Sequence, residues 1–229
     1  MEAPKQDRSG AARNVVILLG GPGAGKGTQA ECITRWFQLP HVSSGQLLRA
    51  EVAAGSDLGI RAKALIDAGA LVGDDIVNEL VTQRISSEEC NAGFILDGYP
   101  RDIEQAVNFK RTLSRGDRLI VIDIEVDLER VIPRLTGRRS CKSCNGVYHL
   151  VSSPPRRPGF CDHCGSVLVQ RSDDREDVIR ERFATYRALT KPLTELYQHW
   201  GVYHHVDGMQ TQDGVSRDIR RLLEISDRV

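Results

Sequence analysis

An apolar segment rich in β-branched residues, 14–19 (NVVILL), is followed at once by a run of glycines that ends in a lysine. This run, 20–28, reads GGPGAGKGT, and a helical pattern continues to Phe37. A β-branched run of this kind is typical of a parallel strand that is covered on both faces. Glycines after such a strand let backbone N–H groups face inward, where they and the helix N-terminus bind phosphate oxygens. The sequence therefore predicts a phosphate-binding loop whose Lys26 reaches the terminal phosphates.

Strand-like and helix-like segments alternate along much of the remaining chain. Further strands are predicted over 93–97, 119–124 and 202–206, and helices over 103–113, 128–135, 176–198 and 214–225. This alternation predicts a doubly wound α/β fold with a parallel sheet. Two segments interrupt it. Residues 44–73 are helical throughout and predict a small insert, whereas 137–174 have no helical period and predict a separate lobe.

Four cysteines of that lobe form two close pairs. The pattern is Cys141-x₂-Cys144, 16 residues, then Cys161-x₂-Cys164, and a glycine follows each pair. The N-terminal residues contain no apolar stretch of the kind that secretory signals have, so metal ligation is favoured over disulfides, which remain the alternative. The spacing fits a structural Cys₄ zinc ribbon. We therefore expect a lobe that is held together by a metal ion.

The charge balance and the hydropathy exclude two classes of protein. Lys+Arg and Asp+Glu both number 31, so the net charge of zero argues against a nucleic-acid binder that is held by bulk charge. No apolar run approaches the length that a membrane span needs. We therefore expect no nucleic-acid partner and no membrane partner.

Taken together, the motifs resemble those of the nucleoside monophosphate kinases, and of the adenylate kinases above all. One sign is in the glycine-rich loop, where Gly27 rather than Ser or Thr follows the lysine. Another is Gln105, which falls four residues after Arg101 as this family places it. The resemblance covers about residues 14–210, and its further segments are 43–49 (SSGQLLR, similar to STGDxLR), 70–72 (ALV, similar to GxLVP), 97–101 (DGYPR), 134–139 (RLTGRR) and 170–182 (QRSDDREDVIRER).

The resemblance implies an architecture for the whole chain. The expected fold is a P-loop NTPase-type doubly wound parallel sheet with a helical monophosphate-binding insert and a zinc-ribbon lid, similar to the lid of some bacterial adenylate kinases. The implied parts are a disordered leader at 1–13, a core at 14–43, 73–136 and 175–229, the insert at 44–72 and the lid at 137–174.

The resemblance also implies a mechanism of positioning and charge neutralisation, for which arginine forks suit phosphate. The implied catalytic residues are Lys26, Arg101, Arg138, Arg171 and Arg182. The implied ATP-binding residues are Gly23, Ala24, Gly25, Lys26, Gly27, Thr28, Arg134, Arg138, Val147, Tyr148 and Gln210. The implied AMP-binding residues are Ser44, Arg49, Ala70, Leu71, Val72, Gly98, Tyr99, Pro100, Arg101, Gln105, Arg171 and Arg182. Asp97 is implied as the outer-shell partner of Mg²⁺, and Cys141, Cys144, Cys161 and Cys164 as the ligands of Zn²⁺.

The implied reaction is ATP + AMP ⇌ 2 ADP, carried out by a cytoplasmic monomer. An alternative is a kinase for another acceptor or donor base, although Gln105 favours adenine because an amide can pair with the adenine edge. A distant alternative is a zinc-ribbon nucleic-acid-binding NTPase. Ser44, Gln46 and Gly73 depart from the family pattern of Thr, Asp and Pro, and we expect these departures to affect acceptor affinity or lid and insert dynamics rather than the chemistry.

Overall fold

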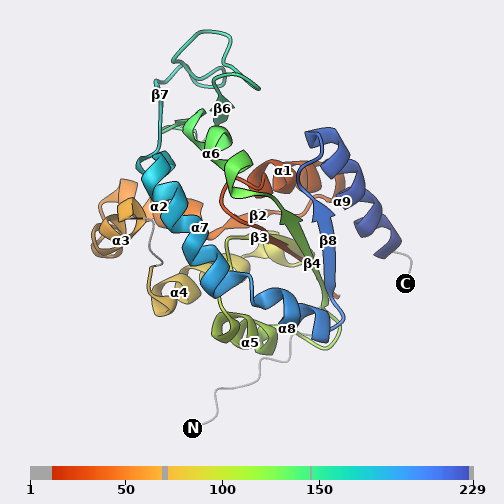
Figure 1. Ribbon diagram of the computed structural model, residues 1–229. Coiled ribbons are helices and arrows are strands. Elements are labelled where there is room, and N and C mark those ends of the chain that lie inside the picture. The colour runs from red at the N-terminus through yellow and green to blue at the C-terminus, as the bar shows by residue number, and fades with distance from the viewer. Residues whose placement is uncertain (1–11, 69–71, 145, 227–229) are drawn as a thin grey trace.

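The computed structural model describes residues 12–68, 72–144 and 146–226 (Figure 1). Residues 1–11 of the predicted leader, and the predicted contacts Ala70 and Leu71, lie outside the described residues. Arg13, which we placed in the leader, is tied to the fold, because its Nε donates to both carboxylate oxygens of Asp117 at 3.1 Å.

A parallel five-stranded sheet forms the centre of the molecule, with strand order β2-β3-β1-β4-β8. Its strands are β1 (Asn14–Leu19), β2 (His41–Ser43), β3 (Gly93–Asp97), β4 (Arg118–Glu125) and β8 (Tyr203–Asp207). The strands predicted over 14–19, 93–97, 119–124 and 202–206 are confirmed, with small shifts at their ends. The β2 strand was not predicted, because a segment of three residues carries no period to detect.

Apolar side chains cover both faces of the sheet, so that alternate residues of β1 belong to two different cores. Val15 and Ile17 pack with residues of α4 (Asp74–Ile85), α5 (Ile103–Thr112) and α8 (Leu193–His199). Val16 and Leu18 pack with residues of the helices that cover the other face. These are α1 (Lys26–Phe37), α6 (Leu128–Thr136), α7 (Glu176–Thr185) and α9 (Gln212–Ser226). Double coverage explains why β1 reads as an unbroken apolar run and confirms the predicted α/β class.

The segment after β2 is helical, as predicted, and contains no strand among its described residues. It comprises α2 (Ser44–Ala54) and α3 (Asp57–Ala68), which lie beside the sheet (Figure 1). The two helices are separated at Gly55, whose φ of 66° is left-handed and therefore favours glycine. The next helix, α4, was not predicted.

The helical pattern predicted over 176–198 is confirmed in outline, but it is interrupted rather than a single regular α-helix. Helix α7 ends at Thr185, a π-helical segment occupies Tyr186–Thr190, and α8 begins only at Leu193. The backbone stays right-handed helical through Lys191 and Pro192. Pro192 explains part of the interruption, since proline has no N–H to continue the helical hydrogen-bond ladder.

The lobe predicted over 137–174 contains a small antiparallel sheet of order β6-β5-β7, which projects from the core (Figure 1). The strands are β5 (Arg138–Cys141), β6 (Val147–His149) and β7 (Leu168–Val169), and a short 3₁₀ turn at Ser172–Asp174 ends the lobe. A second 3₁₀ turn, Glu88–Cys90, lies in the core before β3. Among the described residues of the lobe, the buried apolar cluster consists of Cys141, Tyr148, Cys161 and Leu168. In the part of the chain that the structure describes, no helix combines the length and apolarity that crossing a bilayer requires.

Candidate active site

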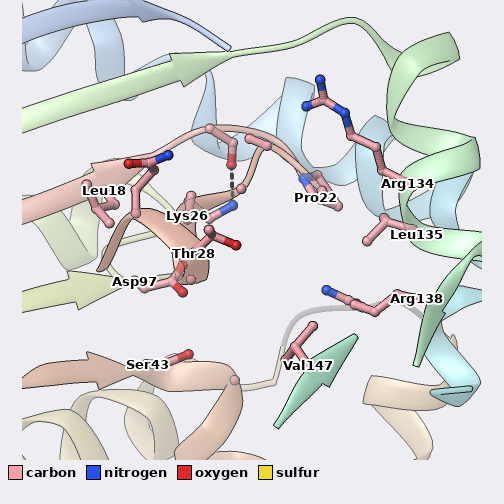
Figure 2. Close-up of a pocket in the computed structure, with 18 of the residues that line it drawn as sticks. Leu18, Pro22, Lys26, Thr28, Ser43, Asp97, Arg134, Leu135, Arg138 and Val147 are labelled. Atoms are coloured by element: carbon pink, nitrogen blue, oxygen red, sulfur yellow. Dashed lines mark hydrogen bonds between the residues drawn. The ribbon is translucent and has the colours of Figure 1, made fainter. Parts of the chain in front are cut away.

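A cavity of about 730 Å³ opens at the carboxyl ends of β1 and β3, where α/β sheets place their ligands. The phosphate-binding loop, the β3 end at Asp97, the insert and the lid all contribute to its lining. Figure 2 shows Lys26, Asp97 and Arg138 around this space. The insert and the lid also contact each other, since the Ser172 hydroxyl donates to a carboxylate oxygen of Asp67.

Gly20 and Gly23 of the loop are required by close packing. A Cβ on Gly20 would lie 2.5 Å from the carbonyl oxygen of Ile124, and Gly20 has a φ of 136°. A Cβ on Gly23 would lie 2.9 Å from Val131 Cγ1. The loop therefore rests directly on β4 and α6, which leaves its other side open to the cavity.

Lys26 is the first residue of α1 and folds back over the loop. Its Nζ donates to the carbonyl oxygens of Gly20 at 2.8 Å and Gly21 at 2.9 Å (Figure 2). Burial lowers the pKa of Lys26 to about 8, although the carboxylate of Asp97 acts in the opposite direction. A polyanion held on the loop would favour the charged ammonium, so this lysine is suited to bind phosphate.

Asp97 ends β3 on the floor of the cavity and is paired with His41 of β2. His41 Nε2 lies 3.3 Å from Asp97 Oδ2. Burial acts to raise the pKa of Asp97, but the His41 hydrogen bond and the charge of Lys26 outweigh it and hold this pKa below its usual range. The carboxylate is therefore charged at neutral pH and available to a cation or its waters. His41 is not recognisable from the sequence, because its role depends on the pairing of β2 with β3.

Six arginines line the same cavity, and five of them, all except Arg134, come from the insert, the β3 loop and the lid side. Burial, and then the charge of Arg182, lower the pKa of Arg101 to about 10. Burial, and then the charge of Arg138, lower that of Arg171 to about 9. Cations that repel one another in a buried space are stabilised by an anion placed between them. The five are Arg49, Arg101, Arg138, Arg171 and Arg182.

Two buried carboxylates hold the lid-side arginines in place. Arg138 donates from Nε to Asp174 Oδ2 at 2.8 Å and from Nη2 to Oδ1. Arg182 Nη1 lies 2.8 Å from Asp173 Oδ2. A bidentate pair fixes the plane of a guanidinium, so these carboxylates set the direction in which the arginines face.

The predicted nucleotide contacts divide into two groups according to their positions. Most of them line the cavity, including Arg134, Val147, Tyr148 and Gln210 on the lid and α9 side. Of those that the structure describes, three do not. They are Ser44, Tyr99 and Gln105, and each is buried.

The three buried residues make hydrogen bonds within the protein. The Ser44 hydroxyl donates to the carbonyl of Gly98 at 2.7 Å, and the Tyr99 hydroxyl donates to Asn78 Oδ1 at 2.6 Å. Gln105 uses both ends of its amide, since Oε1 accepts from the Arg101 N–H at 2.9 Å and Nε2 donates to Asp74 Oδ1 at 2.5 Å. In this structure, therefore, Gln105 supports the Arg101 loop.

The four lid cysteines bring their sulfur atoms within 4.8 Å of one another. Cys141 and Cys164 have sulfurs 3.4 Å apart, as do Cys144 and Cys161. All four are free thiols, and these separations exceed the disulfide bond length of about 2.05 Å. They approach the spacing of about 3.8 Å that follows from tetrahedral Zn–S bonds of about 2.3 Å. The geometry thus favours a metal site over the disulfide alternative.

The lid also stabilises thiolate at one of these positions. The Asp162 N–H donates to the Tyr148 hydroxyl oxygen at 2.7 Å, which leaves the hydroxyl proton directed at Cys161 Sγ, 3.4 Å away. This hydrogen bond lowers the pKa of Cys161 to about 6. Because metals bind thiolate rather than thiol, the cluster is compatible with zinc.

Comparison with known proteins identifies the family. The family model for adenylate kinase matches residues 18–202. An adenylate kinase of a Geobacillus species is 44% identical over 210 residues, which cover 91% of this chain and 97% of the relative. One from Archaeoglobus fulgidus is 42% identical over 91% of this chain and 97% of the relative. The chain belongs to the adenylate kinase family. A further adenylate kinase, from Trichlorobacter lovleyi, is 47% identical over 85% of this chain and 92% of the relative.

Membership of the adenylate kinase family confirms the resemblance that the motifs carried, and it makes the chain a phosphotransferase. It also explains the distribution of charge in the cavity. Transfer of a phosphoryl group needs little acid–base chemistry and much charge neutralisation. This cavity meets that need, because six arginines and the buried Lys26 line it.

Proposed function

We propose that the chain catalyses ATP + AMP ⇌ 2 ADP in the 730 Å³ cavity. The observation that carries this proposal is the presence of two anion-binding ends in one cavity. The glycine-rich loop with Lys26 forms one end, and Arg49 and Arg101 lie toward the insert at the other. Two nucleotides that are bound phosphate to phosphate would fill such a space.

On the donor side, the loop N–H groups and Lys26 bind the ATP phosphates. Arg134 stacks on the donor base through the face of its guanidinium group. The two terminal nitrogens of this group donate to the Gly208 carbonyl at 3.3 and 3.4 Å, and these hydrogen bonds help to orient it. The other donor contacts are Gly23, Ala24, Gly25, Gly27, Thr28, Arg138, Val147, Tyr148 and Gln210.

On the acceptor side, Arg49 and Arg101 bind the monophosphate bidentately. Val72, which lies at the cavity wall and is 5% exposed, contacts the acceptor base. The remaining acceptor contacts at the cavity wall are Gly98, Pro100, Arg171 and Arg182. Ala70 and Leu71 complete the set from the insert. Ser44, Tyr99 and Gln105 would contact the acceptor only on giving up their hydrogen bonds within the protein.

Between the two nucleotides, Arg138, Arg171 and Arg182 neutralise the charge of the transferring phosphoryl group. Lys26 acts at the same group from the loop. Because the carboxylates of Asp173 and Asp174 already orient two of these arginines, little reorganisation is needed at the moment of transfer.

Two metal ions belong to this proposal. Mg²⁺ bound with ATP would supply charge neutralisation at the phosphates, and the charged Asp97 would hold it through water. The four lid cysteines would hold Zn²⁺ as thiolates, and with four protein ligands the ion would be structural. We also propose that the enzyme is a monomer that acts in the cytoplasm on ATP and AMP, without a nucleic-acid or membrane partner.

We expect purified protein with Mg²⁺ to transfer phosphate from ATP to AMP in preference to CMP, UMP or GMP. The measurement is a matrix of kcat/KM values for four donors and four acceptors, made with and without added RNA or DNA. A preference for a different acceptor would favour the related kinases. Activity that requires nucleic acid would favour the zinc-ribbon NTPase alternative.

Arg101→Ala and Gln105→Ala should separate phosphate binding from base recognition. We expect Arg101→Ala to lower kcat/KM for all acceptors, because every one carries the phosphate. We expect Gln105→Ala to relax the preference for AMP over the other acceptors by about 10- to 100-fold, which is the range for loss of a buried polar contact. To recognise the base, Gln105 Nε2 would have to break its hydrogen bond to Asp74 Oδ1 and donate to adenine instead. Equal loss with all four acceptors would instead restrict Gln105 to supporting Arg101.

A further inference from the structure

The π-helical segment Tyr186–Thr190 has no role in the proposal above, yet it lies against both ends of the cavity. Segments of this kind are rare and occur frequently at functional sites. Here the segment directly follows α7, the helix that carries Arg182. At its start, Tyr186 packs beneath the phosphate-binding loop, where a Cβ on Gly21 would lie 3.6 Å from Tyr186 Cδ1. At its end, the Thr190 hydroxyl donates to the carbonyl oxygen of Arg101 at 2.7 Å.

Thr190 differs from the other residues that hold Arg101. The Arg101 N–H donates to Gln105 Oε1 at 2.9 Å, and Arg101 Nε donates to the Gly98 carbonyl at 2.7 Å. Both partners lie within four residues of Arg101, so these bonds fix only the local shape of the loop. Thr190 is 89 residues away along the chain. Of these three hydrogen bonds, the one from Thr190 therefore fixes the Arg101 loop relative to a distant element.

The residue after the segment fastens it to the sheet beside the phosphate-binding loop. Lys191 Nζ donates to Glu125 Oε1 at 2.8 Å and to Asp123 Oδ2 at 3.4 Å, both on β4. Asp123 is the register partner of Leu19, the last residue of β1 before the loop. The segment thus connects the donor end of the cavity to Arg101 through short, directional contacts.

The side chain of Arg101 is left with its terminal nitrogens for a ligand. Among the described residues, no hydrogen bond or ion pair engages Nη1 or Nη2, while Nε is held by Gly98. The direction in which these nitrogens face depends on the position of the Arg101 backbone, which Thr190 holds. A misplacement of about 1 Å between reacting groups can cost about 100-fold in rate.

We propose that Thr190 is a positioning residue that sets the distance between Arg101 and the phosphate-binding loop, and thereby aligns the acceptor phosphate with the donor. The proposal rests on the role given above to Arg101. Without the Thr190 hydroxyl, the Arg101 carbonyl loses its partner and the acceptor loop is no longer tied to α7 and β4.

Thr190→Val removes the hydroxyl at nearly constant volume, and Thr190→Ser retains it. We expect Thr190→Val to raise the KM for AMP about tenfold and to lower kcat, as loss of one hydrogen bond to a part-buried carbonyl allows. The KM for ATP should stay within about twofold, and Thr190→Ser should restore both constants. The matched control is Thr194→Val in α8, because the Thr194 hydroxyl also donates to a carbonyl, that of Lys191 at 2.9 Å, but away from the cavity.

The outcomes separate this proposal from the function on which it rests. If Thr190→Val leaves both constants for AMP unchanged while Arg101→Ala raises the KM for AMP, positioning by Thr190 is wrong and the role of Arg101 stands. If Thr190→Val and Thr194→Val lower the melting temperature equally and change kcat and KM for ATP and AMP to the same extent, Thr190 is merely structural. If Arg101→Ala has no effect on AMP, the proposed acceptor site itself fails.

Discussion

We expect Lys26→Met to lower the turnover of ATP and AMP by about 1,000-fold or more, because it removes the positive charge that acts on the transferring phosphoryl group. The methionine occupies a similar volume, but it cannot donate to the carbonyls of Gly20 and Gly21 as Nζ does at 2.8 and 2.9 Å. The fold should survive, since burial already disfavours the charged form of Lys26, whose pKa is lowered to about 8. Loss of a cation from this position therefore costs more in catalysis than in stability.

The measurement is steady-state turnover beside circular dichroism and a melting curve. Lys110→Met is the control, because Lys110 lies on α5 and stacks over the Trp200 ring, 3.9 Å from its centroid, outside the cavity. We expect this control to keep normal turnover. Turnover above about a tenth of the wild-type value in folded Lys26→Met protein would contradict the assignment of the loop.

The elements that were predicted correctly are those specified by residues close together in the sequence. The β1 strand and its loop were recognisable because a doubly buried strand is apolar along its whole length and the following glycines are needed at close contacts such as Gly20 with Ile124. The break between α7 and α8 was missed, because a helical period of apolar residues continues through a π-helical segment. The three-residue strand β2 was missed because it is specified by its neighbour β3 rather than by its own sequence.

The same limit applies to the site. Family motifs supplied the arginines, which are recognisable because each lies in a conspicuous segment. The motifs also included Asp174, which lies 36 residues from Arg138 and holds it. They did not supply His41, the partner of Asp97, or Thr190, the partner of Arg101, since those contacts join residues 56 and 89 positions apart and lie outside the recognised segments. Gln105 shows the converse, because its spacing suggested a base contact while its amide is occupied within the protein.

The lid is the part of the chain whose stability we expect to depend on metal. Its buried cluster contains only two large side chains, Tyr148 and Leu168, beside Cys141 and Cys161. Other apolar residues of the lobe face solvent, with Val151 84% exposed and Val167 60% exposed. So small a core cannot offset the entropy of ordering the lobe, and metal binding supplies folding free energy in such cases.

We therefore expect one tightly bound Zn²⁺ per chain, and we expect Cys144→Ser or removal of zinc to lower the melting temperature and to expose the lid to proteases. The phosphate-binding loop and the central sheet should remain folded, because none of the four cysteines lies in them. Metal analysis, melting curves and limited proteolysis provide the measurements. Ser143→Ala is the matched control, since Ser143 lies beside the ligand, is exposed and contributes only a hydroxyl contact to Ser166.

Activity at low temperature distinguishes a structural ion from a catalytic one. The lid contributes Arg138 through β5, and Arg138 is also held by Asp174 in the turn before α7, so that its placement does not depend on the cysteines alone. Zinc-free protein should consequently keep part of its activity in the cold and lose it on warming, as the lid unfolds. A metal-free protein with an unchanged melting temperature would show that the cluster contributes no stability. A zinc-free enzyme that is inactive at every temperature yet retains a protease-resistant lid would place the metal in the reaction itself.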